Sequence, residues 1–154
     1  MNRATKDSVY CAAKRMQGLP YEWDSMNCLL LLADVLREAS ILHQWDVEVP
    51  FSYWSWRRSR EQLVEFVDKA LADRLAPAYS SIEVPVAGYV PQVGDIHIYR
   101  PSQTKTEHAG LVVSEGGNVR IIHCVEQDNV GVVDITPIPA DWVIHHIRRI
   151  QDGQ

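Results

Sequence analysis

The sequence predicts an α+β domain, in which helices come first along the chain and an antiparallel sheet follows. Apolar residues recur with helical spacing up to about residue 75, and after about residue 92 the spacing changes towards two, as in strands with one buried face. The length of 154 residues, with 46% hydrophobic and 23% charged side chains, suits one compact core. We therefore expect a single domain over residues 1–154.

Three helices are expected in the first half of the chain. Residues 4–17 place their apolar side chains on one helical face, and Gly18 and Pro20 end this pattern. A second helix, from about Asn27 to Ala39, is apolar at almost every turn, which predicts burial on most of its circumference. A third, over residues 57–75, is amphipathic and is interpreted as a scaffold or a lid.

Aromatic side chains gather between the second and third expected helices. They are Trp45, Phe51, Tyr53, Trp54 and Trp56. Such a density of aromatics can line a binding groove, where these side chains supply much of the contact energy. It can equally pack a long loop onto the core, and the residues alone leave both interpretations open.

Five short strands are expected after a loop over residues 77–91. Their ranges are Val93–Tyr99, Ala109–Val113, Val119–Val125, Val130–Ile135 and Val143–Ile150. Gly116, Gly117 and Asn118 have the composition of a tight hairpin turn between the second and the third strand. The expected architecture is an antiparallel meander of about five strands with N-terminal helices packed on it.

Composition and charge exclude several classes of partner. A net charge of -5 and a pI near 5.6 argue against nucleic acids and anionic membrane surfaces, which require clustered Lys and Arg. No apolar stretch is long enough to span a bilayer, and the first residues lack the apolar segment of a secretory signal. The three cysteines, Cys11, Cys28 and Cys124, cannot all pair, so synthesis in a reducing cytoplasm is expected.

Cys28 lies where a loop is expected to become a helix. Residues 18–27 are rich in turn formers, and Asn27 or Ser25 can cap the helix that follows. The free N–H groups and the dipole of a helix N-terminus favour a thiolate, which is the nucleophilic form, and can hold an oxyanion. A buried cysteine packing at the start of a core helix explains the position equally well. Cys11, inside the first helix, is interpreted as a core or surface residue without a catalytic role.

Two histidines can complete a catalytic set with Cys28. His108 opens the second expected strand and His123 lies near the end of the third, so pairing across the hairpin can bring their imidazoles together. A cysteine nucleophile needs a base, and the base needs a group that orients it. His97 is a rival base. His145 and His146 are, like His97, more simply interpreted as structural or surface residues.

A zinc site is the competing use of the same side chains. Cys124 adjoins His123, and Cys28 and His108 could join them. The chain has no paired spacing typical of zinc ligands, such as C-x-x-C or H-E-x-x-H. We therefore predict no metal and no cofactor.

Several stretches, taken in order, carry a family resemblance. They are Gly18-Leu19-Pro20-Tyr21, Asn27-Cys28, Val93-Gly94-Asp95-Ile96-His97-Ile98-Tyr99, Glu107-His108-Ala109-Gly110-Leu111-Val112-Val113 and Ile121-Ile122-His123-Cys124. Their order and spacing resemble the NlpC/p60 family of cell-wall cysteine peptidases over most of the chain. The stretch Pro50-Phe51-Ser52-Tyr53-Trp54 and the closing strand, with Trp142 and Ile147-Arg148-Arg149-Ile150, are similar to short peptidases encoded with phage tails and gene transfer agents.

The resemblance implies a papain-like fold and a thiol peptidase. It implies Cys28 as nucleophile, His108 as base, His123 as the orienting residue and Tyr21 as a cleft residue that hydrogen-bonds near the thiol. Asn27 stands where the family has Asp, on the substrate and oxyanion side. Because such peptidases cleave peptidoglycan stem peptides, the implied partners are peptidoglycan peptide and other phage-tail or cell-wall proteins. The implied site of action is the virion tail or the periplasm and cell wall.

The residues after the thiol depart from the family pattern. Leu29-Leu30-Leu31 replaces the usual Ser-Gly-Leu, and the loop from Tyr21 to Cys28 lacks the usual glycine pair. Small residues let helix and substrate approach closely, so leucines here narrow or reshape a cleft. Two alternatives therefore stay open. One is a catalytically weak or inactive papain-like module with a structural or binding role, and the other is a thiol amidohydrolase acting on an amide outside peptidoglycan.

Overall fold

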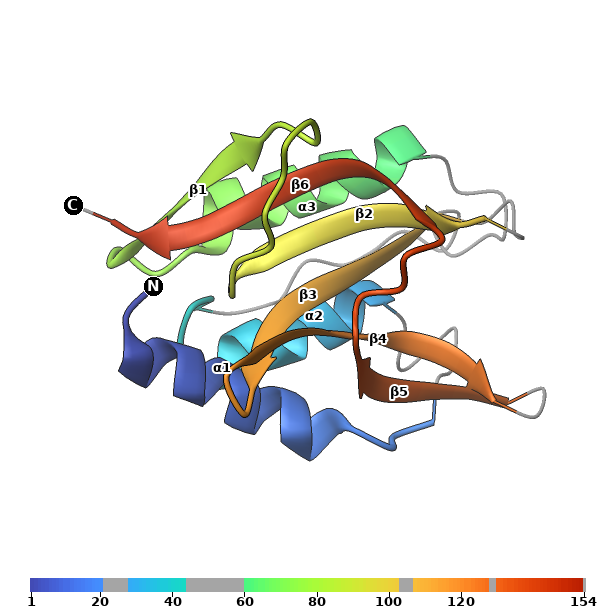
Figure 1. Cartoon of the computed structure of the whole chain (residues 1–154). Coiled ribbons are helices and arrows are strands. Elements are labelled where there is room, and N and C mark those ends of the chain that lie inside the picture. The colour runs from blue at the N-terminus through green and yellow to red at the C-terminus, as the bar shows by residue number, and fades with distance from the viewer. Residues whose placement is uncertain (21–27, 44–59, 103–106, 128–129, 154) are drawn as a thin grey trace.

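Three helices and one antiparallel sheet of six strands make up the described residues, 1–20, 28–43, 60–102, 107–127 and 130–153 of a computed structural model (Figure 1). The α+β class is therefore confirmed. The helices are α1 (Arg3–Met16), α2 (Cys28–Glu38) and α3 (Arg60–Arg74). The strands are β1 (Tyr79–Val84), β2 (Asp95–Pro101), β3 (His108–Glu115), β4 (Asn118–Gln127), β5 (Val130–Thr136) and β6 (Trp142–Asp152).

The sheet has the strand order β1-β6-β2-β3-β4-β5, and every neighbouring pair is antiparallel. The predicted meander is present from β2 to β5. The last strand instead returns to pair with β2 on its other side. The turn between β3 and β4 is formed by Gly116 and Gly117, whose φ angles of 59° and 81° are those that a tight hairpin of this type requires.

One expectation is wrong, because the region predicted as a loop over residues 77–91 contains a sixth strand, β1. This strand lies at the edge of the sheet and pairs only with β6, in a register that places Tyr79 opposite Asp152. Its residues are half-buried or exposed, so its sequence carries no clear alternation of apolar and polar residues. Pairing with β6, distant in sequence, makes this segment a strand.

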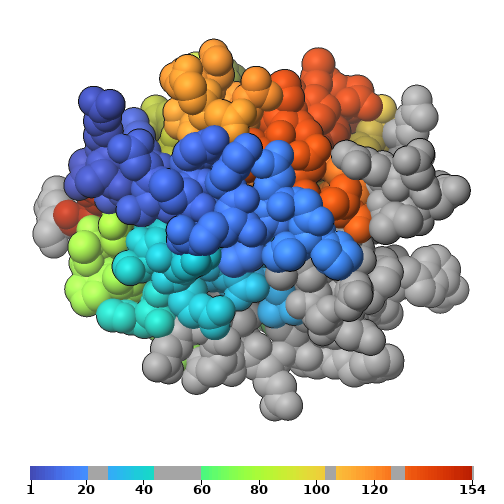
Figure 2. All heavy atoms as spheres, turned by 90° about the horizontal axis from the view of Figure 1, so that it is seen from below, coloured from blue at the N-terminus to red at the C-terminus, as the bar shows by residue number. Residues whose placement is uncertain are grey.

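The helices form for the reasons that the sequence suggests. The side chain of Asn2 caps α1 by accepting a hydrogen bond from the Thr5 N–H at 2.9 Å. The inward face of α1 buries Val9, Ala12 and Ala13, and that of α3 buries Leu63, Val67, Ala70 and Leu71. Seen from below, α1 lies across the surface of the molecule with α2 beside it (Figure 2). No helix among the described residues is long and apolar enough to cross a membrane.

The two faces of the sheet bury different side chains. Ile96 and Ile98 of β2 belong to the main core, together with residues of all three helices. Because side chains alternate along a strand, Asp95, His97 and Tyr99 lie on the opposite face. In Figure 1 the segment that joins β1 to β2 crosses this second face, in front of β6 and β2. The second face therefore carries the polar and aromatic groups that concern function.

Gly110 of β3 is expected to tolerate no side chain. A Cβ added there would lie 2.8 Å from Cδ1 of Ile121 and 3.2 Å from the carbonyl oxygen of Ile122. Ile121 is fully buried and cannot move away freely. Gly110→Ala is expected to lower the free energy of unfolding by about 1–3 kcal/mol through overpacking. Urea denaturation measures this, with Ser114→Ala in the same strand as a control that should change stability little.

Candidate active site

Cys28 is the first residue of α2, close to where the sequence predicts the helix to begin. Only 1% of the residue is exposed, and it belongs to the main core, which also contains Ala109 of β3 and Ile122 of β4. The helix packs against both of these strands. The thiol therefore lies at a helix N-terminus on the helix-covered face of the sheet.

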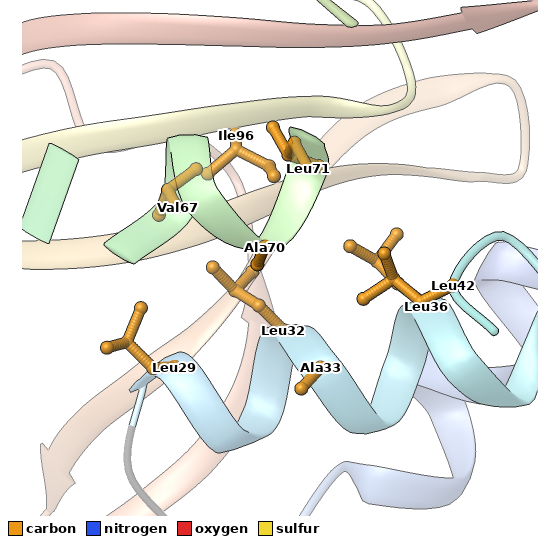
Figure 3. Close-up of a pocket in the computed structure, with 9 residues that line it drawn as sticks. All are labelled: Leu29, Leu32, Ala33, Leu36, Leu42, Val67, Ala70, Leu71 and Ile96. Atoms are coloured by element: carbon orange, nitrogen blue, oxygen red, sulfur yellow. The ribbon is translucent and has the colours of Figure 1, made fainter. Parts of the chain in front are cut away.

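The leucines that follow Cys28 are core residues. Leu29 and Leu31 are buried, and Leu29 points into the space between α2, α3 and β2 (Figure 3). The cavity there has a volume of about 10 Å³, and its lining is entirely apolar: Leu29, Leu32, Ala33, Leu36, Leu42, Val67, Ala70, Leu71 and Ile96. A space of this size holds at most one water, and an apolar wall gives that water no partner. The cavity is a packing void between α2 and α3.

The two predicted histidines line a single pocket of about 250 Å³, here called the histidine pocket. Its lining residues are Tyr99, Pro101, His108, His123, Cys124, Val125 and Trp142. His108 is half-buried as the first residue of β3, whereas only 4% of His123 is exposed. The described lining residues carry no permanently charged side chain. Two aromatic rings, two imidazoles and three smaller uncharged side chains therefore form the described walls.

Tyr99 lies at the centre of the ring contacts in the histidine pocket. Its ring stacks on Trp142, with centroids 3.6 Å apart and an interplanar angle of 11°. It also stacks on His108, which is its partner across β2 and β3, at 5.7 Å and 24°. His123 meets Trp142 edge-on at 4.9 Å. Four rings from four strands thus pack as one aromatic cluster.

Both ring nitrogens of His123 have partners within hydrogen-bond distance. Nε2 is 2.7 Å from the Thr136 hydroxyl oxygen, and Nδ1 is 3.4 Å from the Tyr99 hydroxyl oxygen. Neither partner is His108. Burial lowers the pKa of His123 to about 4, and nearby His108 acts in the same direction, while Asp134 opposes the shift. His123 is therefore a neutral imidazole at pH 7.

Contacts of Glu107 with Arg60 and His145 hold the start of β3 in place next to His108. Glu107, which is 7% exposed, lies 3.6 Å from Nε of Arg60 and 3.4 Å from Nε2 of His145. These contacts join β3 to the first residue of α3 and to β6. Burial lowers the pKa of His145, and Glu107 opposes that shift. Glu107 and His145 therefore serve to position the strand end that carries His108.

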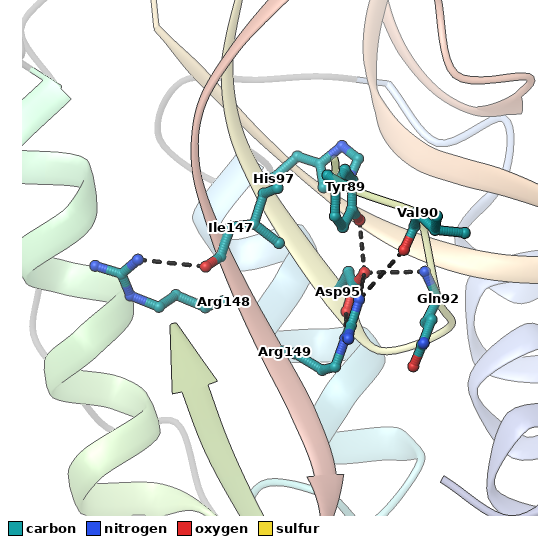
Figure 4. Close-up of polar contacts among 8 residues, drawn as sticks. All are labelled: Tyr89, Val90, Gln92, Asp95, His97, Ile147, Arg148 and Arg149. Carbon is teal, nitrogen blue, oxygen red and sulfur yellow. Dashed lines mark hydrogen bonds and ion pairs between the residues drawn. The ribbon is translucent and has the colours of Figure 1, made fainter. Parts of the chain in front are cut away.

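A second polar cluster lies at the start of β2, at the end of the strand away from the histidine pocket, with Asp95 at its centre (Figure 4). Oδ1 of Asp95 accepts from Nε of Arg149 at 2.7 Å, and Oδ2 accepts from the Tyr89 hydroxyl at 2.5 Å and the Gln92 N–H at 2.9 Å. The Tyr89 oxygen is also 2.6 Å from Nε2 of His97. Asp95 and His97 are fully buried. Because Tyr89 and Gln92 belong to the segment between β1 and β2, their hydrogen bonds to Asp95 anchor that segment.

The protonation of this cluster follows from its hydrogen bonds. Burial and the hydrogen bond to Asp95 raise the pKa of the Tyr89 hydroxyl. Tyr89 donates its only hydrogen to Asp95, so Nε2–H of His97 donates to the Tyr89 oxygen. Nδ1 of His97 then carries the lone pair and has no partner among the described residues. Burial lowers the pKa of His97 to about 4. His97 is a structural residue in this arrangement.

The structure brings some of the predicted site residues together and places others apart. His108 and His123 share the histidine pocket, but Cys28 is not among the residues that line it. By strand alternation, His108 and His123 lie on the face opposite Ala109 and Ile122, which pack in the core with Cys28. Tyr21 and Asn27 lie outside the described residues, as do the aromatic residues from Trp45 to Trp56.

Sequence reasoning did not identify Tyr99, Trp142 and Thr136 as site residues. The strand pattern could have indicated Tyr99, because alternate residues of a strand share a face and Tyr99 follows Asp95 and His97 in this way. Trp142 reaches the pocket because β6 pairs with β2, and Thr136 reaches His123 because β5 pairs with β4. No local pattern reports such contacts.

Among the described residues, no three His, Cys, Asp or Glu side chains are grouped so that they could hold a metal ion. Comparison with known protein families, curated proteins and solved structures finds no match for this chain.

Proposed function

We propose that this chain is a papain-like cysteine peptidase or amidase of the NlpC/p60 type, which cleaves peptidoglycan stem peptides. The observation that carries the proposal is the position of two residues. The helix that begins at Cys28 packs against the strand that begins at His108. A thiol at a helix N-terminus and an imidazole at the start of the adjacent strand are the two groups that thiol catalysis needs.

The proposed reaction starts when the Cys28 thiolate attacks the carbonyl carbon of the amide. The N–H groups of the first turn of α2, with Tyr21 and Asn27 on the substrate side, stabilise the oxyanion. Protonated His108 gives its proton to the leaving amine as the C–N bond breaks, which leaves a thioester on Cys28. His108 then takes a proton from water, which attacks the thioester and releases the carboxylic acid and the thiolate. Cys28 is 1% exposed, and the His108 side chain points to the face opposite the core that holds the thiol. Turnover therefore requires substrate binding to uncover the thiol and to bring His108 within reach of the leaving amine.

The test compares wild type, Cys28→Ala and Cys11→Ala on purified sacculi, with released peptides quantified by liquid chromatography and mass spectrometry. Loss of the nucleophile is expected to reduce release at least about 10³-fold. Cys11 lies on the exposed side of α1, so Cys11→Ala should keep full activity. Full release by Cys28→Ala, or no iodoacetamide adduct on Cys28 at neutral pH with substrate present, contradicts the proposal.

The burial of Cys28 favours a second candidate function, a peptidoglycan-binding module that retains the fold without turnover. The Cys28 side chain packs in the core. The ring nitrogens of His123 contact Thr136 and Tyr99, and neither of these partners is His108. Cosedimentation with sacculi without release of peptides would support this alternative. Cleavage that depends on Cys28 rules it out. If the protein leaves sacculi undigested but cleaves a different amide, it is instead a thiol amidohydrolase with another substrate.

A further inference from the structure

The hydrogen bonds of His123 fix which of its nitrogens carries the proton. The Thr136 hydroxyl donates its only hydrogen to the carbonyl oxygen of Pro137, at 3.0 Å. Towards Nε2 of His123, at 2.7 Å, Thr136 can therefore only accept. It follows that Nε2 carries the hydrogen and that Nδ1 carries the lone pair. The Tyr99 hydroxyl, 3.4 Å from Nδ1, is then the donor in that contact.

The same tyrosine holds the second imidazole by its ring. Tyr99 is 1% exposed and stacks on Trp142 at 3.6 Å, which leaves its ring little freedom to turn. Its ring also stacks on that of His108, its direct partner in the β2–β3 ladder. Stacked and edge-to-face ring pairs each favour a defined geometry. One buried side chain therefore contacts both imidazoles, through different parts of its structure.

We propose that Tyr99 is the positioning residue of the histidine pocket, with its ring fixing the orientation of His108 and its hydroxyl engaging Nδ1 of His123. As a role in catalysis, this inference rests on the proposed function. This arrangement differs from one in which His123 orients His108 through a direct hydrogen bond. In this structure both nitrogens of His123 are engaged by Tyr99 and Thr136, so the connection between the imidazoles runs through Tyr99.

The first test measures the imidazoles of the free protein by long-range ¹H–¹⁵N NMR. In wild type, neutral His123 should show the Nε2–H tautomer. Tyr99→Phe removes the donor to Nδ1, which favours the neutral form, so the pKa of His123 should rise while the ring signals of His108 stay in place. Tyr99→Leu removes the ring as well and should shift the signals of His108. Tyr10→Phe is the matched control, because its hydroxyl donates to Glu115 at 2.8 Å, on another part of the molecule.

A further variant keeps the test decisive if Tyr99→Leu does not fold. Thr136→Val removes the acceptor for Nε2–H, so neutral His123 should shift towards the Nδ1–H tautomer and donate to the Tyr99 oxygen. Unchanged His123 signals in both Tyr99→Phe and Thr136→Val overturn the assignment. Unchanged His108 signals in a folded Tyr99→Leu protein overturn the positioning of that ring.

The second test follows sacculus digestion by the same variants. Tyr99→Leu is expected to lower kcat about 10²-fold through misplacement of the base, with KM changed less. Tyr99→Phe should lower kcat less than Tyr99→Leu does, since it keeps the stacked ring. If wild type releases no peptides, the proposed function fails, and the NMR result still decides whether Tyr99 positions the imidazoles. Normal kcat in Tyr99→Leu, with active wild type, overturns the catalytic part of the inference.

Discussion

Asp95→Ala is expected to lower the free energy of unfolding by about 3–5 kcal/mol, the cost of breaking a buried ion pair by removing one partner. Asp95 is fully buried, and its carboxylate accepts hydrogen bonds from Arg149, Tyr89 and the Gln92 N–H. Alanine leaves the Arg149 guanidinium, with 18% of its side chain exposed, without its counter-ion. The segment between β1 and β2 loses its anchor at the same time.

The neighbouring arginine provides the matched control for this experiment. Arg148 pairs with Asp68 at 2.7 Å, the same separation as in the Arg149–Asp95 pair, but the Asp68 side chain is 46% exposed. Asp68→Ala is expected to cost less than about 1 kcal/mol, because exposed ion pairs are worth little. Urea denaturation of both variants measures the difference. An equal loss in the two proteins would mean that burial of Asp95 does not determine its contribution.

Acidification from pH 6.5 towards pH 4 is expected to remove about 6 kcal/mol of stability through His97 and His123 together. Burial lowers the pKa of each to about 4, while an unfolded histidine titrates near 6.5. Above pH 6.5 both histidines are neutral in the folded and in the unfolded protein, so they add no pH dependence to stability. Below it the unfolded chain binds the protons first, which destabilises the fold by about 1.4 kcal/mol per pH unit for each histidine.

Chemical denaturation at a series of pH values measures this dependence. The range between pH 6.5 and 5 is the most informative, because Asp and Glu titrate mostly below it. His123→Gln should lower the slope by about 1.4 kcal/mol per pH unit, because it removes one of the two histidines whose pKa is about 4. Glutamine keeps a donor and an acceptor for Thr136 and Tyr99. A stability that stays flat over this range would show that both histidines are hydrated in the folded protein.

The local patterns of the chain predicted the elements that depend on near neighbours. The helix that starts at Cys28 follows from turn formers before it and apolar residues after it. Gly116 and Gly117 specify the hairpin, and its pairing sets the register of β3 and β4. His108 and His123 share a pocket because their strands are joined by this short turn. The edge strand β1 was missed because half-buried residues leave no clear period.

The sequence by itself therefore determined the α+β class, the helices, the meander from β2 to β5 and the common location of two histidines. Only the tertiary structure decided that Cys28 packs in the core and that Tyr99 joins the two imidazoles. It also decided that Asp95 is neutralised by Arg149, 54 residues further along the chain. The physical reason is that these contacts depend on the return of β6 beside β2 and on packing between the helices and the sheet. Side chains brought together in this way are separated by many residues, and no period or spacing in the sequence reports them.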